Sequence, residues 1–129
     1  MSYFDGEFAE VTYDSGMGAI VARMDEYAEG EEFRRYMDSI IDAMDATGSD
    51  RIIADTSEIP PLDQDDQQWS VVDWAPRAED SGLEHMAMVM PESVVSEMSI
   101  ENVVEMSDDT INRELFDELE DAKTWIGRQ

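Results

Sequence analysis

Hydrophobic and polar residues alternate along the chain in blocks that predict strands and helices in turn. Residues 7–14 and 17–24 have the pattern of strands, and residues 14–16 (Asp-Ser-Gly) supply a turn between them. Residues 31–47 repeat apolar side chains on one helical face, and Gly48 follows as a stop signal. The first third of the chain is therefore predicted to be a β-hairpin followed by an amphipathic helix.

The segment 51–91 predicts the centre of the fold. Residues 51–55 have a continuously apolar middle, which is typical of a strand covered on both faces, and residues 83–90 look like a second interior strand. A helix is predicted over about 63–81, and Pro76 is expected to kink it or break it in two. Two such strands joined by a helix form a right-handed crossover with parallel strands, whose carboxyl ends commonly carry function.

The last third of the chain predicts shorter elements. Residues 91–106 indicate one or two helical turns, with a restart at Ser99, before a turn at 107–109. A final edge strand is predicted over 110–115. Asp117 and Glu120 then have the spacing of a capping box, followed by a helix that turns Leu119, Ala122 and Ile126 inward beside Trp125.

The predicted order is β-β-α-β-α-β-α-β-α, which indicates an α/β layered domain. We expect a single domain over 1–129, with an opening β-hairpin, a mixed sheet of four to five strands and about four helices. Residues 1–6 are expected to be flexible.

Charge changes the picture most, because 33 acidic residues against 8 basic ones give a net charge of −25. The acids are dispersed along the chain, and molar salt shortens the Debye length to ~3 Å and so screens their repulsion. We interpret this composition as that of a halophilic archaeon with a salt-saturated cytoplasm; the alternative is an acidic protein that binds a basic partner. Nucleic acid is excluded as a partner, because its phosphates would be repelled.

Several classes of protein receive no support from the sequence. The chain has no Cys, so neither a disulfide framework nor a thiolate metal site is expected. The first ten residues lack the basic region and apolar core of a signal peptide, and no apolar run approaches the ~20 residues of a membrane span, so we expect a cytoplasmic protein that does not enter a membrane.

Catalytic and metal-binding patterns are also weak. His85 is the one histidine, and no Ser lies in a G-x-S-x-G setting. The acidic run 63–66 suggests a calcium loop, but its sixth and twelfth positions hold Gln68 and Trp74 in place of Gly and Glu. Phosphate-binding glycine loops are absent from the sequence. No metal or cofactor is therefore predicted, and a binding or regulatory module is favoured over an enzyme.

Residues 55–57 (Asp-Thr-Ser), at the end of a predicted core strand after a hairpin, resemble the D-x-S step of STAS domains, the SpoIIAA-like anti-sigma-factor antagonists. That family places a D-S-S-G turn next, and its second Ser is phosphorylated by a partner kinase. Asp63 matches the first position here, but Gln64, Asp65 and Asp66 replace the rest. The resemblance implies a STAS-like fold and partner binding, with only Thr56 and Ser57 left as phosphate acceptors.

The chain also resembles small uncharacterised proteins of the STAS-like and CRAL-TRIO-like superfamily over about residues 8–127. The matching motifs are E-G-E-E-F-R, D-Q-x-W…W-x-P-R-A, V-x-P, M-S-x-E-N and F-D-x-L-x-x-A-x-x-W, found at 29–34, 66–78, 89–91, 98–102 and 116–125. This resemblance implies the fold more strongly than any activity.

Three functions are predicted, in decreasing order of support. The first is a non-enzymatic, STAS-like regulatory module that binds a protein partner through the loop and helix start after the central strand, at Asp55, Thr56, Ser57, Asp63, Gln64, Asp65 and Asp66. The second is a binder of a small apolar ligand, with Trp69 and Trp74 lining the pocket. The third is a carboxylate-dependent hydrolase that uses His85. If the chain self-associates, a homodimer is the expected assembly.

Overall fold

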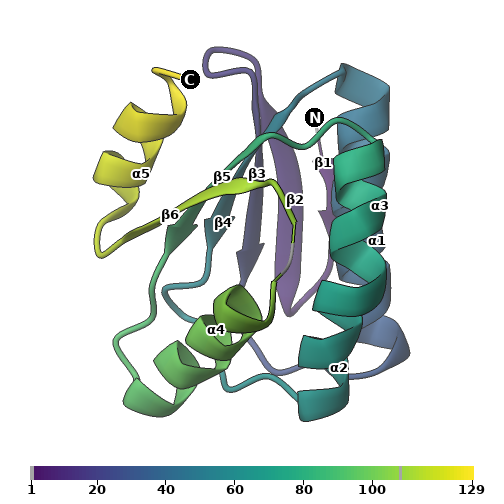
Figure 1. Cartoon of the computed structure of the whole chain (residues 1–129), viewed down its shortest axis with the longest axis vertical. Helices are drawn as coiled ribbons and strands as arrows, with labels where there is room; N and C mark the ends of the chain where they lie inside the picture. Colours follow the sequence, from purple (N-terminus) through teal and green to yellow (C-terminus); the bar gives the residue numbers. More distant parts are fainter. Residues whose placement is uncertain (1, 108) are drawn as a thin grey trace.

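The computed structural model describes residues 2–107 and 109–129, which form one mixed sheet with helices on both faces (Figure 1). Its six strands in this described part are β1 (Ser2–Asp5), β2 (Ala9–Asp14), β3 (Ala19–Met24), β4 (Arg51–Asp55), β5 (His85–Val89) and β6 (Asn112–Phe116). The helices are α1 (Glu31–Thr47), α2 (Gln64–Trp69), the π-helical turn η1 (Ser70–Trp74), α3 (Ala75–Asp80), α4 (Val94–Met106) and α5 (Leu119–Ile126).

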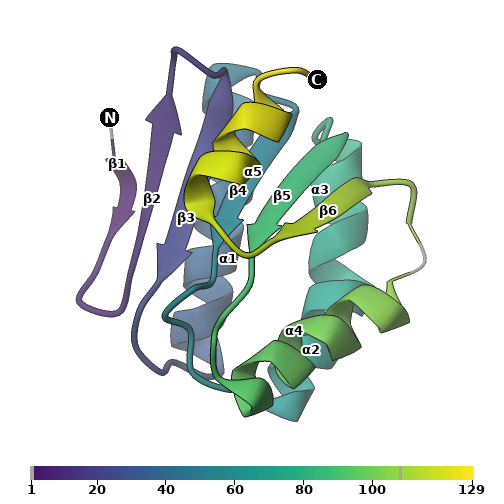
Figure 2. The same ribbon diagram turned by 90° about the vertical axis from the view of Figure 1, so that its left-hand side faces the viewer.

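The strands lie side by side in the order of the chain, from β1 to β6. Neighbours are antiparallel from β1 to β3 and parallel from β3 to β6. Helix α1 and the run α2–η1–α3 lie on one face of the sheet, α5 crosses the other face, and α4 lies below β6 (Figures 1 and 2). The predicted α/β class and the opening hairpin are confirmed, but the sheet has six strands and not four or five.

The additional strand is β1, in a segment that the sequence pattern suggested was flexible. Ser2–Asp5 pairs with β2, and the register shifts between Ser2 and Phe4, as in a β-bulge. Phe4 packs edge-on against Phe8 and Tyr36, with ring centroids 5.5 and 5.8 Å apart. Aromatic packing of this kind holds so short a strand in place where backbone propensity alone gives little signal. Met1 lies outside the described residues.

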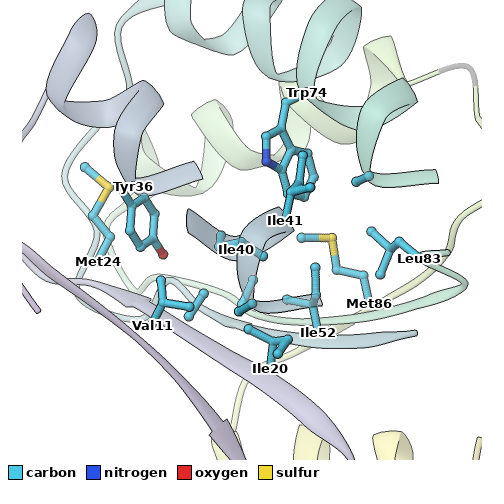
Figure 3. Close-up of a cluster of buried hydrophobic side chains, with 14 of the residues drawn as sticks. Val11, Ile20, Met24, Tyr36, Ile40, Ile41, Ile52, Trp74, Leu83 and Met86 are labelled. Atoms are coloured by element: carbon cyan, nitrogen blue, oxygen red, sulfur yellow. The ribbon is translucent and has the colours of Figure 1, made fainter. Parts of the chain in front are cut away.

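The central strands are buried on both faces, as their apolar pattern predicts. On the α1 side, Ile20 and Ile52 are fully buried and pack with Ile40 and Trp74 in the main core (Figure 3). On the α5 side, a smaller core consists of Ala19, Ile53, Ala87, Val89, Ala122 and Ile126. The predicted inward face of the last helix is therefore confirmed.

Pro76 does not end the helix, but the regular α-helix is interrupted just before it, as two α-helical pieces joined by a π turn. Residues 64–80 are helical throughout, and the turn before the proline is π-helical, with the backbone N–H of Ala75 donating to the carbonyl of Ser70. A proline ring in a regular α-helix clashes with the carbonyl four residues earlier, and its nitrogen has no hydrogen to donate. The wider π turn removes that clash, so the helix continues through Pro76.

The C-terminal elements agree with the predictions only in part. Helix α4 is continuous and does not restart at Ser99; it begins after Ser93, whose hydroxyl accepts a hydrogen bond from the N–H of Ser96. The predicted edge strand is confirmed as β6. The predicted capping box of α5 is wrong, because Glu118 is the N-cap and no side chain caps the helix. The turn predicted at 107–109 includes residue 108, which lies outside the described residues.

A buried carboxylate links the first helix to the second. Helix α1 begins after Gly30 (φ 62°) without a side-chain cap. The N–H of Gly30 donates to Oδ2 of Asp66 at 2.9 Å, and Nε of Arg34 lies 3.4 Å from Oδ1. The side chain of Asp66 is 1% exposed, so its carboxylate is shielded from water, whereas the side chain of Arg34 is 41% exposed. Asp66 therefore caps α1 from a position 36 residues later in the chain.

We expect Asp66→Asn to lower the free energy of unfolding by about 2–3 kcal/mol, because an amide of the same shape loses the charge and turns N–H donors toward Arg34. Asp65→Asn is the matched control; Asp65 is exposed in the same helical turn, so its loss should cost less than about 1 kcal/mol. Denaturant unfolding of both variants at one salt concentration measures the difference. Equal losses would contradict the clamp.

Candidate interaction site

A depression of about 480 Å³ opens at the carboxyl ends of β4 and β5. Parallel pairing of the two strands brings Asp55 beside Val89, and the loops that follow both strands form the walls. Its lining residues are Asp55, Ser57, Glu58, Ile59, Val89, Met90, Pro91, Glu92, Ser93, Asp117, Glu118 and Leu119. This is the end of a parallel sheet at which binding sites of α/β proteins are usually built.

The loop after β4 is held by side chains of its own. One carboxylate oxygen of Asp55, Oδ1, accepts hydrogen bonds from the hydroxyl (2.7 Å) and the N–H (3.2 Å) of Ser57. Thr56 is tied to the next strand, because its N–H (3.1 Å) and its hydroxyl both donate to the carbonyl of Val89. Thr56 is buried, whereas Ser57 lies at the rim of the depression.

The depression is strongly acidic. Five of its lining residues are carboxylates (Asp55, Glu58, Glu92, Asp117 and Glu118), and no lysine, arginine or histidine is among the residues that line it. A concave surface with charges of one sign concentrates the field and attracts groups of the opposite sign. Cationic side chains are therefore the chemistry that this depression fits best.

The residues that the sequence predicted as one site are divided between two places. Asp55 and Ser57 line the depression, whereas residues 63–66 build the start of α2. Asp63 is the N-cap, and its carboxylate accepts from the N–H groups of Asp65 (3.1 Å) and Asp66 (3.4 Å). The acidic run thus satisfies backbone donors of its own helix, which is the ordinary use of Asp at this position.

Gln64 and Asp65 are exposed, and Gln64 borders a separate groove against α4. The loop before them is fixed to that helix, because the N–H of Leu62 donates to the hydroxyl of Ser99 at 3.2 Å. Residues 63–66 are therefore a structural feature near the depression and not part of its lining.

The two tryptophans of the predicted pocket have different surroundings. Trp74 is 2% exposed, donates through Nε1 to the carbonyl of Met37 at 2.7 Å, and lines a cavity of about 80 Å³ in the main core (Figure 3). Trp69 does not line this cavity; it packs against Phe33 and has the guanidinium carbons of Arg34 and Arg77 at 5.2 and 5.7 Å from its ring centroid.

The core cavity is small for a ligand site. Pockets that bind small molecules have volumes of about 300–1,000 Å³. A cavity of about 80 Å³ holds only a few heavy atoms. The hypothesis of an apolar ligand therefore gains no support from this cavity and stays a prediction.

His85 lies at the amino end of β5, whereas the depression lies at the carboxyl end of that strand. Its Nδ1 is 3.3 Å from the side-chain amide of Asn112, and its ring stacks edge-on against Trp125 at 6.2 Å. His85 is thus separated from Asp55 by the length of the strand. The two groups cannot act together on one substrate.

Neither a metal centre nor a membrane span is found in the part of the chain that the structure describes. Over 2–107 and 109–129, no three or more His, Asp or Glu side chains gather as ligands for an ion. No helix within the same residues has the length and apolar character needed to cross a bilayer.

Sequence reasoning missed most of the depression, because only Asp55 and Ser57 among its lining residues were predicted as site residues. Glu92, Asp117 and Glu118 come from the loops after β5 and β6, far along the chain from Asp55. Their signal was available, because acidic residues come within two positions of the end of both predicted strands and the carboxyl ends of parallel strands lie on one edge.

Comparison of the chain with family models, curated proteins and solved structures found no match. No relative therefore supplies a function for the depression.

We expect Trp74→Phe to destabilise the protein by about 2 kcal/mol, through the lost hydrogen bond to Met37 and the larger void. Trp69→Phe is the matched control, and should cost less than about 1 kcal/mol because that ring is partly exposed and keeps its aromatic contacts. Chemical denaturation followed by circular dichroism measures both. A larger loss for the Trp69 variant would show that the two roles are reversed.

Proposed function

We propose that this chain is a non-enzymatic, STAS-like interaction module that binds a protein partner through the acidic depression at the carboxyl ends of β4 and β5. The observation that carries the proposal is the lining of that depression, with five carboxylates and no basic residue among its members. The surface of the partner is accordingly one that presents lysine or arginine side chains.

The position of the depression supports the same function. It lies directly after the Asp55-Thr56-Ser57 step, where the resemblance to STAS domains places partner binding. The loop is held by hydrogen bonds before any partner binds, since Asp55 bonds to Ser57 and Thr56 bonds to Val89. A preorganised surface loses less conformational entropy when a partner binds.

Regulation of the module follows from the same loop. Thr56 is buried and its hydroxyl is bonded, so of the two residues proposed as phosphate acceptors Ser57 is the accessible one. A phosphate on Ser57 would stand beside the carboxylate of Asp55 and would disrupt their hydrogen bond.

We propose that the protein works in the salt-rich cytoplasm of a halophile, where the repulsion between such negative charges is partly screened.

The proposal is tested by quantitative affinity capture from a lysate of the source organism in molar potassium chloride. The wild-type bait should recover a reproducible partner, and Glu58→Arg with Glu92→Arg should reduce its recovery by about tenfold or more, because charge reversal repels a cationic surface. The purified partner should then show the same loss of affinity by calorimetry.

The matched control is Asp42→Arg with Asp45→Arg on the exposed face of α1, which changes the net charge by the same amount. This control should keep the partner. Recovery that falls equally in both double variants would show a general charge effect and would refute the site. Absence of any reproducible partner would refute the proposed function.

A further inference from the structure

Helix α4 exposes three apolar side chains of its first two turns and buries two serines, while Ile100 packs into the main core. Val94, Val95 and Met98 are 70%, 60% and 57% exposed, while Ser96 and Ser99 are buried. A helix on the surface of a domain normally turns its apolar face toward the core. The exposed apolar side chains of α4 therefore point to a surface that is covered in the working state of the protein.

Strand β6 ends the sheet beside this helix, and among the described residues no further strand pairs with its outer edge. Its hydrogen bonds to β5 use Asn112 and Phe116, and backbone groups alternate along a parallel strand, so those of Arg113 and Leu115 face outward. At the opposite end of the sheet, β1 is shortened and carries a bulge, which is a common protection against further pairing. The register of β6 with β5 has no such interruption over its five residues.

A groove of about 310 Å³ runs between α4 and this edge. Figure 2 shows the two elements next to each other at the β6 side of the sheet. The lining residues of the groove are Met90, Glu97, Glu101, Leu115, Phe116 and Asp117. Leu115 lies on the α4 face of the sheet and is 41% exposed, and α4 contributes Glu97 and Glu101 to the groove, with its exposed apolar side chains outside the lining.

The polar groups of the groove carry one sign of charge. Within the described residues, Glu97, Glu101 and Glu105 of α4 form no salt bridge. Glu97 and Glu101 lie one helical turn apart. A hydrogen bond with Glu97 raises the pKa of the Glu101 carboxyl, and desolvation and the charges of Glu97 and Glu105 act in the same direction. A cationic side chain placed here would relieve this repulsion.

We infer that the α4–β6 groove binds an extended segment of a partner protein that carries both basic and apolar residues, added to the sheet as a further strand beside β6. Leu115 and Glu114 point to opposite faces of the sheet, since side chains alternate along a strand. On the α4 face the side chains of the segment meet Leu115 and the carboxylates of Glu97 and Glu101, and on the opposite face they meet Glu114. Basic side chains therefore pair with glutamates on either face, while apolar ones cover Leu115. Main-chain hydrogen bonds come from Arg113 and Leu115.

A second copy of this chain fits the groove less well. Pairing β6 with its own copy would bring two sets of Glu97, Glu101 and Glu114 together on molecules that each carry a charge of −25. Like charges opposite one another destabilise paired strands. The inference does not rest on the acidic depression, because Glu58 and Glu92 are not among the residues of the groove.

The test uses a short synthetic peptide of alternating lysine and valine, titrated into the full chain labelled with ¹⁵N in about 1 M potassium chloride, which screens non-specific attraction. We expect saturable shifts at the amides of Arg113 and Leu115. Methylating every backbone nitrogen of the peptide removes its donors without changing its charge, and should weaken binding by about tenfold or more. Replacing each lysine of the peptide by glutamate should abolish binding.

Met98→Gln with Leu115→Gln should weaken binding of the unmodified peptide by about tenfold, whereas Val72→Gln, at another exposed apolar side chain, should not. All three positions are exposed, so the variants should keep the spectrum of the folded protein. Equal binding of the methylated peptide, or shifts that avoid β6, would overturn the inference. A concentration-dependent dimer that the Met98 and Leu115 changes dissociate would assign the groove to a second copy instead.

Discussion

The fold depends on burying both faces of β4. Ile52 and Ile53 are adjacent and fully buried, and neighbouring side chains on a strand point to opposite faces. The sheet therefore requires a cover on each side, which α1 and the α2–η1–α3 helix supply on one face and α5 on the other. Because β4 also pairs in parallel with β3 and β5, each connection has to return along a face of the sheet to the edge where the next strand starts. The loops that follow these strands therefore lie together at the opposite edge.

Two acidic regions of different character lie on the surface, one at the carboxyl ends of β4 and β5 and one beside the outer strand β6. The depression beside Asp55 is rigid, polar and built from loops. The groove beside β6 offers apolar side chains and unpaired backbone groups of a strand. Met90 and Asp117 belong to both, so the two regions adjoin. One basic partner could contact both regions at once, with a side chain in one and its main chain along the other.

Much of the fold was predictable from the sequence, because apolar periodicity reports burial directly. The stripe of α1, the apolar centres of β4 and β5 and the inward side of α5 were identified in this way. Strand β1 was missed because aromatic contacts far along the chain, such as that of Phe4 with Tyr36, hold it. The site could not be predicted because the chain has 33 acidic residues and their pattern does not report their surroundings. Asp66, which is buried and bonded to Gly30, and Glu92, which lines the depression, look alike in the sequence.

The π turn has a consequence for the tryptophans around it. Residues five positions apart in an α-helix are about 140° apart around its axis, so in a regular α-helix Trp69 and Trp74 would face different directions. Here both reach α1, one through Phe33 and the other through Met37. The π turn of the helix thus contains one residue more than a turn of regular α-helix would. In chains that share this fold and lack that extra residue, we expect the proline at position 76 to be lost with it.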